Sequence, residues 1–186
     1  MRFNSPVFFC FLLLVVTGLW LLPVRMRRTY LLIASYVFYG SWHYPYLVLL
    51  IGVAALNHWG AIWITAASDR ARRGSWILAA NVALLAMFKY LDWMAGNVNL
   101  IAHLFRGGDI VAIPGWVLPL GISFYIFEGI SYTVDVIRRR ERVHSFWDFQ
   151  LFIAFFPKLI AGPILRGKEL LPQIEQQDRR LSLIHI

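Results

Sequence analysis

Apolar residues fill most of the chain in long blocks, and short polar clusters separate these blocks. A helix needs about 20 mostly apolar residues to cross a bilayer, because each residue adds about 1.5 Å to a core of about 30 Å. A short block, Tyr30 to Trp42, reaches this length only with Thr29 and the residues around His43. Four other blocks qualify directly: Pro6 to Leu22, Tyr44 to Ala67, Ser75 to Ala95, and Trp116 to Ile137. The pattern predicts an all-α transmembrane bundle of about five spanning helices.

The last apolar block, Phe146 to Leu165, is different because Pro157, Gly162 and Pro163 interrupt it and Lys158 lies in its middle. Proline lacks a backbone donor and clashes with the preceding turn, so we do not expect a straight lipid-facing helix here. Basic residues flank the block on both sides, which places its two ends on the same face of the membrane. We predict a re-entrant or in-plane segment whose broken backbone other helices shield from lipid.

Lysine and arginine gather in three clusters between the apolar blocks: Arg25 to Arg28, Arg70 to Arg73, and Arg138 to Arg142. Such clusters in short loops favour the cytoplasmic side of a membrane. Two predicted crossings separate each cluster from the next, so all three fit on that side. This parity predicts an amino terminus outside the membrane. It also places the loop from Gly96 to Gly115 outside, and part of that loop is expected to lie along the membrane surface.

The composition supports the same class, because 59% of the residues are hydrophobic and only 15% are charged, against about a quarter charged in soluble domains. The net charge of +8 comes from the loop clusters, so it predicts contact with membrane lipid and no binding of nucleic acid. The lone Cys10 excludes an internal disulfide and a cysteine metal cluster. No small-residue cleavage site follows the first block, so we expect it to be retained as a helix.

Glu128 is a candidate functional residue because it lies about twelve residues into the predicted helix from Trp116, close to mid-membrane. Ionisable groups at this depth face a bundle interior or a cavity. Glu128 therefore either belongs to a substrate or proton site, or is a carboxyl that is kept neutral or paired with a lysine such as Lys89 or Lys158.

Asn57 and His58 also lie deep within a predicted helix, where we expect them to hydrogen-bond across helices. No group of His, Cys, Asp and Glu has convincing metal-ligand spacing. The sequence also lacks a phosphate-binding loop. The residues alone therefore predict no metal and no bound cofactor, and they leave the function open.

Three strings resemble the amino-terminal half of the membrane-bound O-acyltransferase family, and most closely its bacterial branch of alginate O-acetylation and D-alanine transfer proteins. The strings are YLLIASYVFYGSW (Tyr30 to Trp42), LPLGISFYIFEGISYTVDV (Leu118 to Val136) and FFPKLIAGPILR (Phe155 to Arg166). The phrase FPxLIAGPI is the most specific part of the likeness, which runs from about Phe3 to about Gln177. It makes the following residues candidates for a cavity wall: Phe156, Pro157, Lys158, Gly162, Pro163 and Arg166.

The resemblance implies an all-helical enzyme of the bacterial inner membrane that takes an acyl group from a cytoplasmic donor and passes it across the bilayer to an envelope polymer. In the alginate-type branch the group is acetyl and the donor is thought to be acetyl-CoA. A periplasmic, esterase-like acetyltransferase then completes delivery to the polysaccharide. The family's catalytic histidine lies in the later half of the full protein, so none of the five histidines here is expected to take that role. This chain alone is expected to be inactive.

Relatives in this family more usually carry Gln at the position of Glu128, and Gln or His at the position of Lys158. An uncharged amide at the first position makes a general-base role for Glu128 doubtful. We therefore hypothesise that the two charges compensate each other in this chain.

The last six residues, Leu181 to Ile186, read LSLIHI, which is what a common sequencing-library adapter gives when translated. We expect residues 1–180 to be the amino-terminal part of one membrane domain and residues 181–186 to be a non-native tail. Two other functions stay open at this point. One is half of a transporter or flippase, whose broken segment lines a substrate path, and the other is a non-catalytic membrane scaffold of a polymer-export complex.

Overall fold

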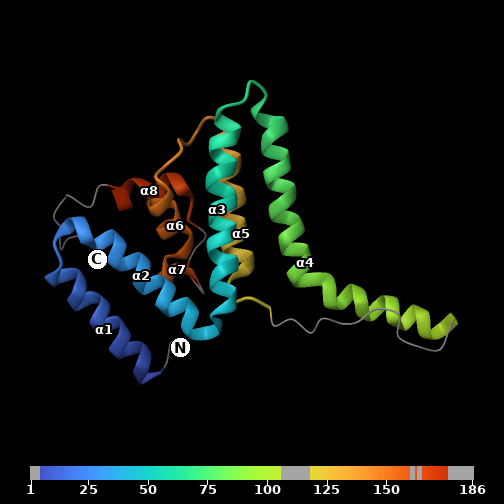
Figure 1. Ribbon diagram of the computed structural model, residues 1–186, viewed down its shortest axis with the longest axis horizontal. Coiled ribbons are helices and arrows are strands. Elements are labelled where there is room, and N and C mark those ends of the chain that lie inside the picture. The colour runs from blue at the N-terminus through green and yellow to red at the C-terminus, as the bar shows by residue number, and fades with distance from the viewer. Residues whose placement is uncertain (1–4, 106–117, 160–161, 163–164, 176–186) are drawn as a thin grey trace.

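The computed structural model describes residues 5–105, 118–159, 162 and 165–175, and each regular element within these ranges is an α-helix. The helices are α1 Pro6–Leu21, α2 Val24–His43, α3 Pro45–Thr65, α4 Arg70–Phe105, α5 Ile122–Ile137, α6 Phe146–Ala154, α7 Phe156–Leu159 and α8 Gly167–Glu175. Helix α3 packs against α2, α4, α5 and α6, so it lies at the centre, while α1 packs along α2 at one edge (Figure 1). The predicted all-α class is confirmed.

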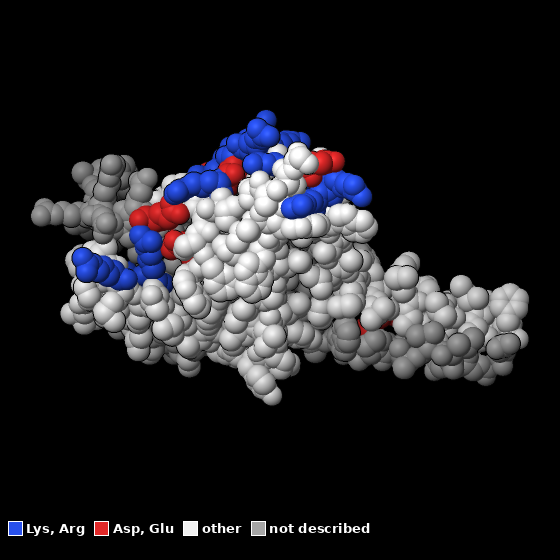
Figure 2. Space-filling view, turned by 45° about the horizontal axis from the view of Figure 1, so that its top comes forward, with Lys and Arg blue, Asp and Glu red and all other residues white. Residues whose placement is uncertain are grey.

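The surface of the bundle is apolar over a wide area. Helices α3 and α4 are long and apolar enough to cross a membrane, and α1 is a shorter apolar helix of 16 residues. Figure 2 shows Lys and Arg gathered along one edge, with a broad uncharged surface beside it. Large side chains such as Leu13, Trp20 and Phe105 are exposed. Such a surface is suited to lipid, and it supports a membrane protein. The number of about five crossings stays a prediction.

Helix α2 is longer than the short block that predicted it. It covers 20 residues, or about 30 Å at 1.5 Å per residue, because it includes the first basic cluster. The arginines fit at its start because they bind groups outside the helix. Arg27 Nε donates to the Leu22 carbonyl at 3.1 Å, beside the end of α1, and Arg28 contacts Asp148 of α6 at 3.5 Å. The chain thus gains a full-length helix by extending into polar sequence.

Helix α4 continues beyond Ala95 to Phe105, so the predicted loop from Gly96 is wrong up to that residue. Asn97 lies within that predicted loop, but its side chain donates to the Trp93 carbonyl at 2.7 Å, one turn earlier on the same helix. The extension bends away from α3 and α5 (Figure 1). The rest of the predicted loop, residues 106–115, lies outside the described residues, and a position along the membrane surface stays a prediction.

Helix α5 begins at Ile122, later than the predicted start, and Trp116 lies outside the described residues. The delay follows from Gly121, whose φ of 71° is left-handed and cannot continue a right-handed helix. The Leu120 carbonyl before it accepts a hydrogen bond from the Tyr39 hydroxyl at 3.0 Å. Glu128 therefore lies near the middle of a 16-residue helix, which still places it deep in the bundle.

A neutral hydrogen-bond network joins the three central helices. The amides of Asn57 on α3 and Asn81 on α4 exchange two hydrogen bonds of 3.0 Å, and Thr133 Oγ1 on α5 donates to Asn57 Oδ1 at 3.0 Å. Gly129 makes the close approach possible, since a Cβ there would lie 2.5 Å from Asn57 Nδ2. The predicted role of Asn57 in joining helices is confirmed. For His58, the described residues give no hydrogen-bond partner to Nδ1.

Candidate functional site

The broken block forms two short helices, α6 and α7, instead of one span. Pro157 cannot donate an N–H to the Ile153 carbonyl four residues earlier, and its ring clashes there. Helix α6 consequently ends at Ala154, and the following residue, Phe155, has a non-helical ψ of 104°. We call residues 146–165 the re-entrant segment, after the topology that the sequence predicts for it.

Contacts with α5 show how far this segment extends along the bundle. Near its start, the ring of Phe149 on α6 lies 4.4 Å from the ring of Tyr132. At the far end of α7, the Leu159 carbonyl oxygen would lie 2.6 Å from a Cβ at Gly121, the residue that caps the start of α5. Coming back, a Cβ at Gly167 would lie 3.2 Å from the Tyr132 ring. Between Phe149 and Leu159 the chain thus extends along most of α5, and at Gly167 it again lies beside Tyr132.

Residues that precede and follow the segment meet in a cluster of charged side chains, which we call the base cluster: Glu141, Arg142, His144 and Glu175. His144 precedes α6 and Glu175 belongs to α8, and His144 Nδ1 lies 2.7 Å from Glu175 Oε1. The second ring nitrogen of His144 lies 2.9 Å from Glu141 Oε1. Arg142 forms an ion pair with the other Glu175 oxygen. The residues before α6 and the end of α8 therefore lie side by side, and their position on one face of the membrane stays a prediction.

Glu175 has a shifted pKa within the base cluster. Partial burial alone would raise it, but the hydrogen bond and charge of His144 and the charge of Arg142 outweigh that effect and lower the pKa. The Glu175 carboxylate is therefore held in its charged form. Its two oxygens contact His144 and Arg142, which attaches the end of α8 to the chain before α6.

The three basic clusters also share this edge of the molecule. Arg28, from the first cluster, contacts Asp148 at 3.5 Å and donates to the Glu175 carbonyl. Arg70, from the second, reaches the Val136 carbonyl at 3.5 Å, just before the third cluster begins. Figure 2 shows the resulting concentration of positive charge on one edge. This common position agrees with the prediction that two crossings separate each basic cluster from the next.

The tip of the segment carries a second ionic contact, which we call the tip pair. Lys158 Nζ on α7 lies 2.8 Å from Glu128 Oε2 on α5, and each side chain is only 5% exposed. The same ammonium lies 3.8 Å from the centre of the Phe152 ring, a cation–π distance. Glu128 is therefore paired with Lys158, one of the two lysines proposed as its partner from the sequence. This geometry agrees with the hypothesis that the two charges compensate each other.

The predicted cavity-wall residues do not all face the same way. Phe156 is buried against the rings of Phe11 and Phe38 at 5.4 and 5.5 Å, whereas Pro157 and Arg166 are exposed. Gly162 is half-buried, and its N–H donates to the Lys158 carbonyl at 3.0 Å, four residues earlier, so the chain turns tightly after α7. Pro163 lies outside the described residues. A role for these residues in a cavity wall stays a prediction.

Sequence reasoning missed the base cluster. Its members lie at positions 141 to 175, in a loop and in a helix that the apolar pattern did not indicate. The i, i+3 spacing of Glu141 and His144 was the only local signal. Within the described ranges, no group of three His, Cys, Asp or Glu side chains is placed to hold a metal ion.

Comparison with known proteins gives relatives along almost the whole chain. The probable alginate O-acetylase AlgI of Pseudomonas aeruginosa is 40% identical over 98% of this chain and 36% of its own length. The protein of that name from Azotobacter vinelandii is 37% identical over 98% of this chain and 38% of its own. The peptidoglycan O-acetyltransferase of Helicobacter pylori is 33% identical over 96% of this chain and 39% of its own.

The chain spans little more than a third of the length of these curated relatives. No protein-family profile and no solved structure matches it. The chain is thus similar to alginate and peptidoglycan O-acetyltransferases, and these similarities agree with the resemblance to the bacterial branch of the membrane-bound O-acyltransferase family.

Proposed function

We propose that this chain is part of a membrane O-acetyltransferase that moves an acetyl group across the bacterial inner membrane for O-acetylation of an envelope polysaccharide. The observation that carries the proposal is the identity of 33 to 40% to O-acetylating enzymes over 96 to 98% of the chain. Alginate is the polymer in most of the relatives' names, and peptidoglycan is the alternative that the Helicobacter protein offers. Acetyl-CoA is the proposed cytoplasmic donor.

The proposed topology has five crossings, α1 to α5, with the amino terminus outside. It is supported by the shared position of the three basic clusters, because lysine and arginine favour the cytoplasmic side. The base cluster then lies at the cytoplasmic face, and the tip pair lies at membrane depth. Helices α2, α3 and α5 cover the re-entrant segment, as irregular backbone at that depth requires.

The proposed role of the re-entrant segment is to form one wall of the passage through which donor and acceptor approach each other. The wall would consist of the buried faces of α6 and α7. Catalysis itself is assigned to the family's histidine, which the resemblance places in the later half of the full protein. A periplasmic, esterase-like acetyltransferase would complete delivery to the polymer.

Complementation tests the proposal. The gene, with its full reading frame, is expressed in an alginate-producing bacterium whose own alginate O-acetylase gene is deleted, and base-labile acetate is measured on purified alginate and on peptidoglycan. We expect acetate to return on alginate. Acetate on peptidoglycan alone would instead select the other polymer. Normal insertion in the membrane with no acetate on either polymer would contradict the proposal.

The same strains separate the enzyme from a transporter or a scaffold. Membranes that contain the protein are given acetyl-CoA with a radioactive acetyl group, together with the periplasmic partner and deacetylated alginate. An acetyltransferase transfers the label to the polymer in proportion to the protein present. A transporter or scaffold would change polymer export in cells while leaving this transfer at the background level.

A further inference from the structure

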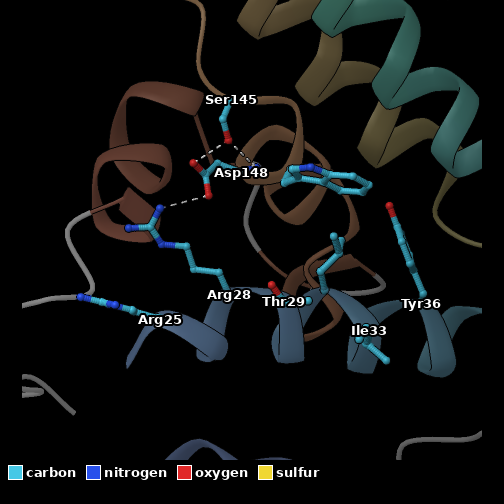
Figure 3. A pocket seen from close by; sticks show the side chains of 9 residues that line it. Arg25, Arg28, Thr29, Ile33, Tyr36, Ser145 and Asp148 are labelled. Carbon is cyan, nitrogen blue, oxygen red and sulfur yellow. Dashed lines mark hydrogen bonds and ion pairs between the residues drawn. The ribbon is translucent and has the colours of Figure 1, made fainter. Parts of the chain in front are cut away.

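A pocket of about 450 Å³ lies between α2 and the start of α6, outside the tip pair and beside the base cluster. Figure 3 shows Arg25, Arg28, Thr29, Ile33 and Tyr36 following one another along α2. The wall from α6 and the residue before it consists of Ser145, Trp147 and Asp148. The pocket thus joins the basic edge of the molecule to its apolar side.

The lining changes from charged to apolar along the pocket. Arg25, Arg28 and Thr29 lie at one end, while Leu32, Ile33 and Tyr36 line the other end. These α2 positions are spaced at three or four residues on one side of the helix, and at 1.5 Å per residue they extend over about 16 Å. An amphiphile with an anionic head and an apolar tail matches this gradient.

The far end of the pocket is closed by polar contacts that fix its shape. The Tyr36 hydroxyl donates to Gln150 Oε1 on α6 at 2.9 Å, and Gln150 Nε2 donates to the Ile51 carbonyl on α3 at 3.2 Å. These contacts hold α2 and α6 at a constant separation. The pocket is therefore part of the folded bundle.

The charge balance at the open end favours an anion. The Asp148 carboxylate already has hydrogen-bond donors within the protein, because it accepts from Ser145 Oγ at 2.8 Å and from Arg28 at 3.5 Å. Arg28 in turn donates to the Glu175 carbonyl. The side chain of Arg25 is exposed and has no hydrogen bond or ion pair among the described residues. Arg25 thus supplies a positive charge that no described protein group neutralises.

We propose that this pocket binds the phosphate headgroup of an anionic phospholipid, with the start of one acyl chain along the apolar end. The inference rests on the proposed membrane topology, which places the pocket at the cytoplasmic interface. Trp147 is 65% exposed and Ile33 is 56% exposed beside the pocket, so its apolar end opens toward the surrounding lipid. Basic pockets between helices on the cytoplasmic side are suited to anionic headgroups.

Lipid retention tests the proposal. The full chain, as its gene encodes it, is purified from nanodiscs of phosphatidylcholine mixed with phosphatidylglycerol, and retained lipids are identified by native mass spectrometry. We expect preferential retention of phosphatidylglycerol. Arg25→Gln should reduce the preference about fivefold, the factor that corresponds to about 1 kcal/mol per arginine near an anionic surface. Arg72→Gln removes an equal charge from the same edge outside the pocket and should leave the preference unchanged.

A second pair of variants tests the pocket's volume without changing charge. Thr29→Trp fills the pocket and should abolish retention, whereas Val37→Trp, at an exposed position of α2 outside the lining, should not. Equal effects of Arg25→Gln and Arg72→Gln would overturn the proposal in favour of a diffuse surface charge. Displacement of the lipid by inorganic phosphate would overturn it in favour of a soluble ligand.

The readout does not depend on acetyl transfer. A protein that acetylates polymer but retains both lipids equally overturns only the lipid site. A protein that retains phosphatidylglycerol in the pocket but transfers no acetate supports the lipid site and contradicts the proposed function.

Discussion

The re-entrant segment is held by ionic contacts at both its tip and its base, and the two sites differ in their surroundings. At the tip, Glu128 and Lys158 are each 5% exposed and have an aromatic ring beside them. At the base, His144 is buried, but Arg142 is 72% exposed and Glu175 is 22% exposed. Similar groups therefore act in an apolar interior at one site and close to water at the other.

This difference determines what each contact costs when it is broken. A buried charge that loses its partner keeps its desolvation penalty, whereas a surface ion pair is screened by water and salt. The tip pair should accordingly decide whether the segment can remain folded at depth. The base cluster should decide how firmly the returning helix α8 is attached.

The largest effect is expected at the tip. Glu128→Gln leaves the Lys158 ammonium buried without a counter-charge, and we expect it to lower the free energy of unfolding by about 3 kcal/mol or more. The measurement is denaturant-induced unfolding of the purified protein in detergent micelles. Glu169→Gln, at an exposed position of α8, is the matched control and should have little effect.

The double variant Glu128→Gln with Lys158→Gln should recover most of that loss, because two neutral amides can hydrogen-bond without a buried charge. If the single variant is as stable as the parent, the tip pair does not hold the segment. In the complementation assay, the double variant should retain acetyl transfer if the two charges only compensate each other.

A smaller effect is expected at the base. His144→Ala removes the donor between Glu141 and Glu175, and we expect a loss of about 1 to 3 kcal/mol. Hydrogen exchange of residues 167–175 should accelerate, while exchange in α3 and α5 stays slow. Equal acceleration throughout the bundle would show that the base supports the whole fold, and not α8 in particular.

Low pH should weaken the base cluster, because Glu175 then becomes protonated. The pKa of Glu175 is lowered in the folded protein, so its contribution is present above its ordinary value of 4.5 and is lost as pH falls through the lowered value. Protection of α8 from exchange should therefore decrease below about pH 4.5. In Glu175→Gln, the dependence in this range should be reduced. An unchanged dependence would assign it to another group.

The smallest effect is expected from the exposed member of the base. Arg142→Gln removes a solvent-accessible ion pair, and such pairs contribute only about 0 to 1 kcal/mol. High salt should reduce the difference between parent and variant, because ions screen exposed charges. The same salt should hardly change the effect of Glu128→Gln. Similar salt sensitivity at both sites would remove the distinction between tip and base.

The sequence predicted the parts of the structure that depend on local chemistry. Apolar length indicated α1, α3 and the core of α4, and Pro157 indicated the break before α7. The positions of the basic clusters indicate that both ends of the re-entrant segment share one face of the membrane, which stays a prediction. Glu128 was identified from its depth, and Lys158 was one of the partners considered for it.

Other features were missed because they depend on tertiary contacts. Asn97 lies in the stretch predicted as a loop, but its side chain donates to a carbonyl of its own helix. Gly121 delays α5, where the closely packed Leu159 carbonyl comes from a segment far along the chain. His144 and Glu175 are 31 residues apart, and no local pattern predicts that they meet.

The proposed return of the re-entrant segment to its starting face bears on how this protein can be assembled. In the proposed topology both of its ends stay on one side of the membrane, so no hydrophilic stretch of it has to be translocated during biogenesis. Within the described part of α6 and α7, the group that must be carried deep into the lipid phase is a single ammonium, that of Lys158. Its counter-ion is synthesised earlier, on α5. The order of residues along the chain therefore allows the Glu128 carboxylate to be in the membrane before the Lys158 ammonium is inserted.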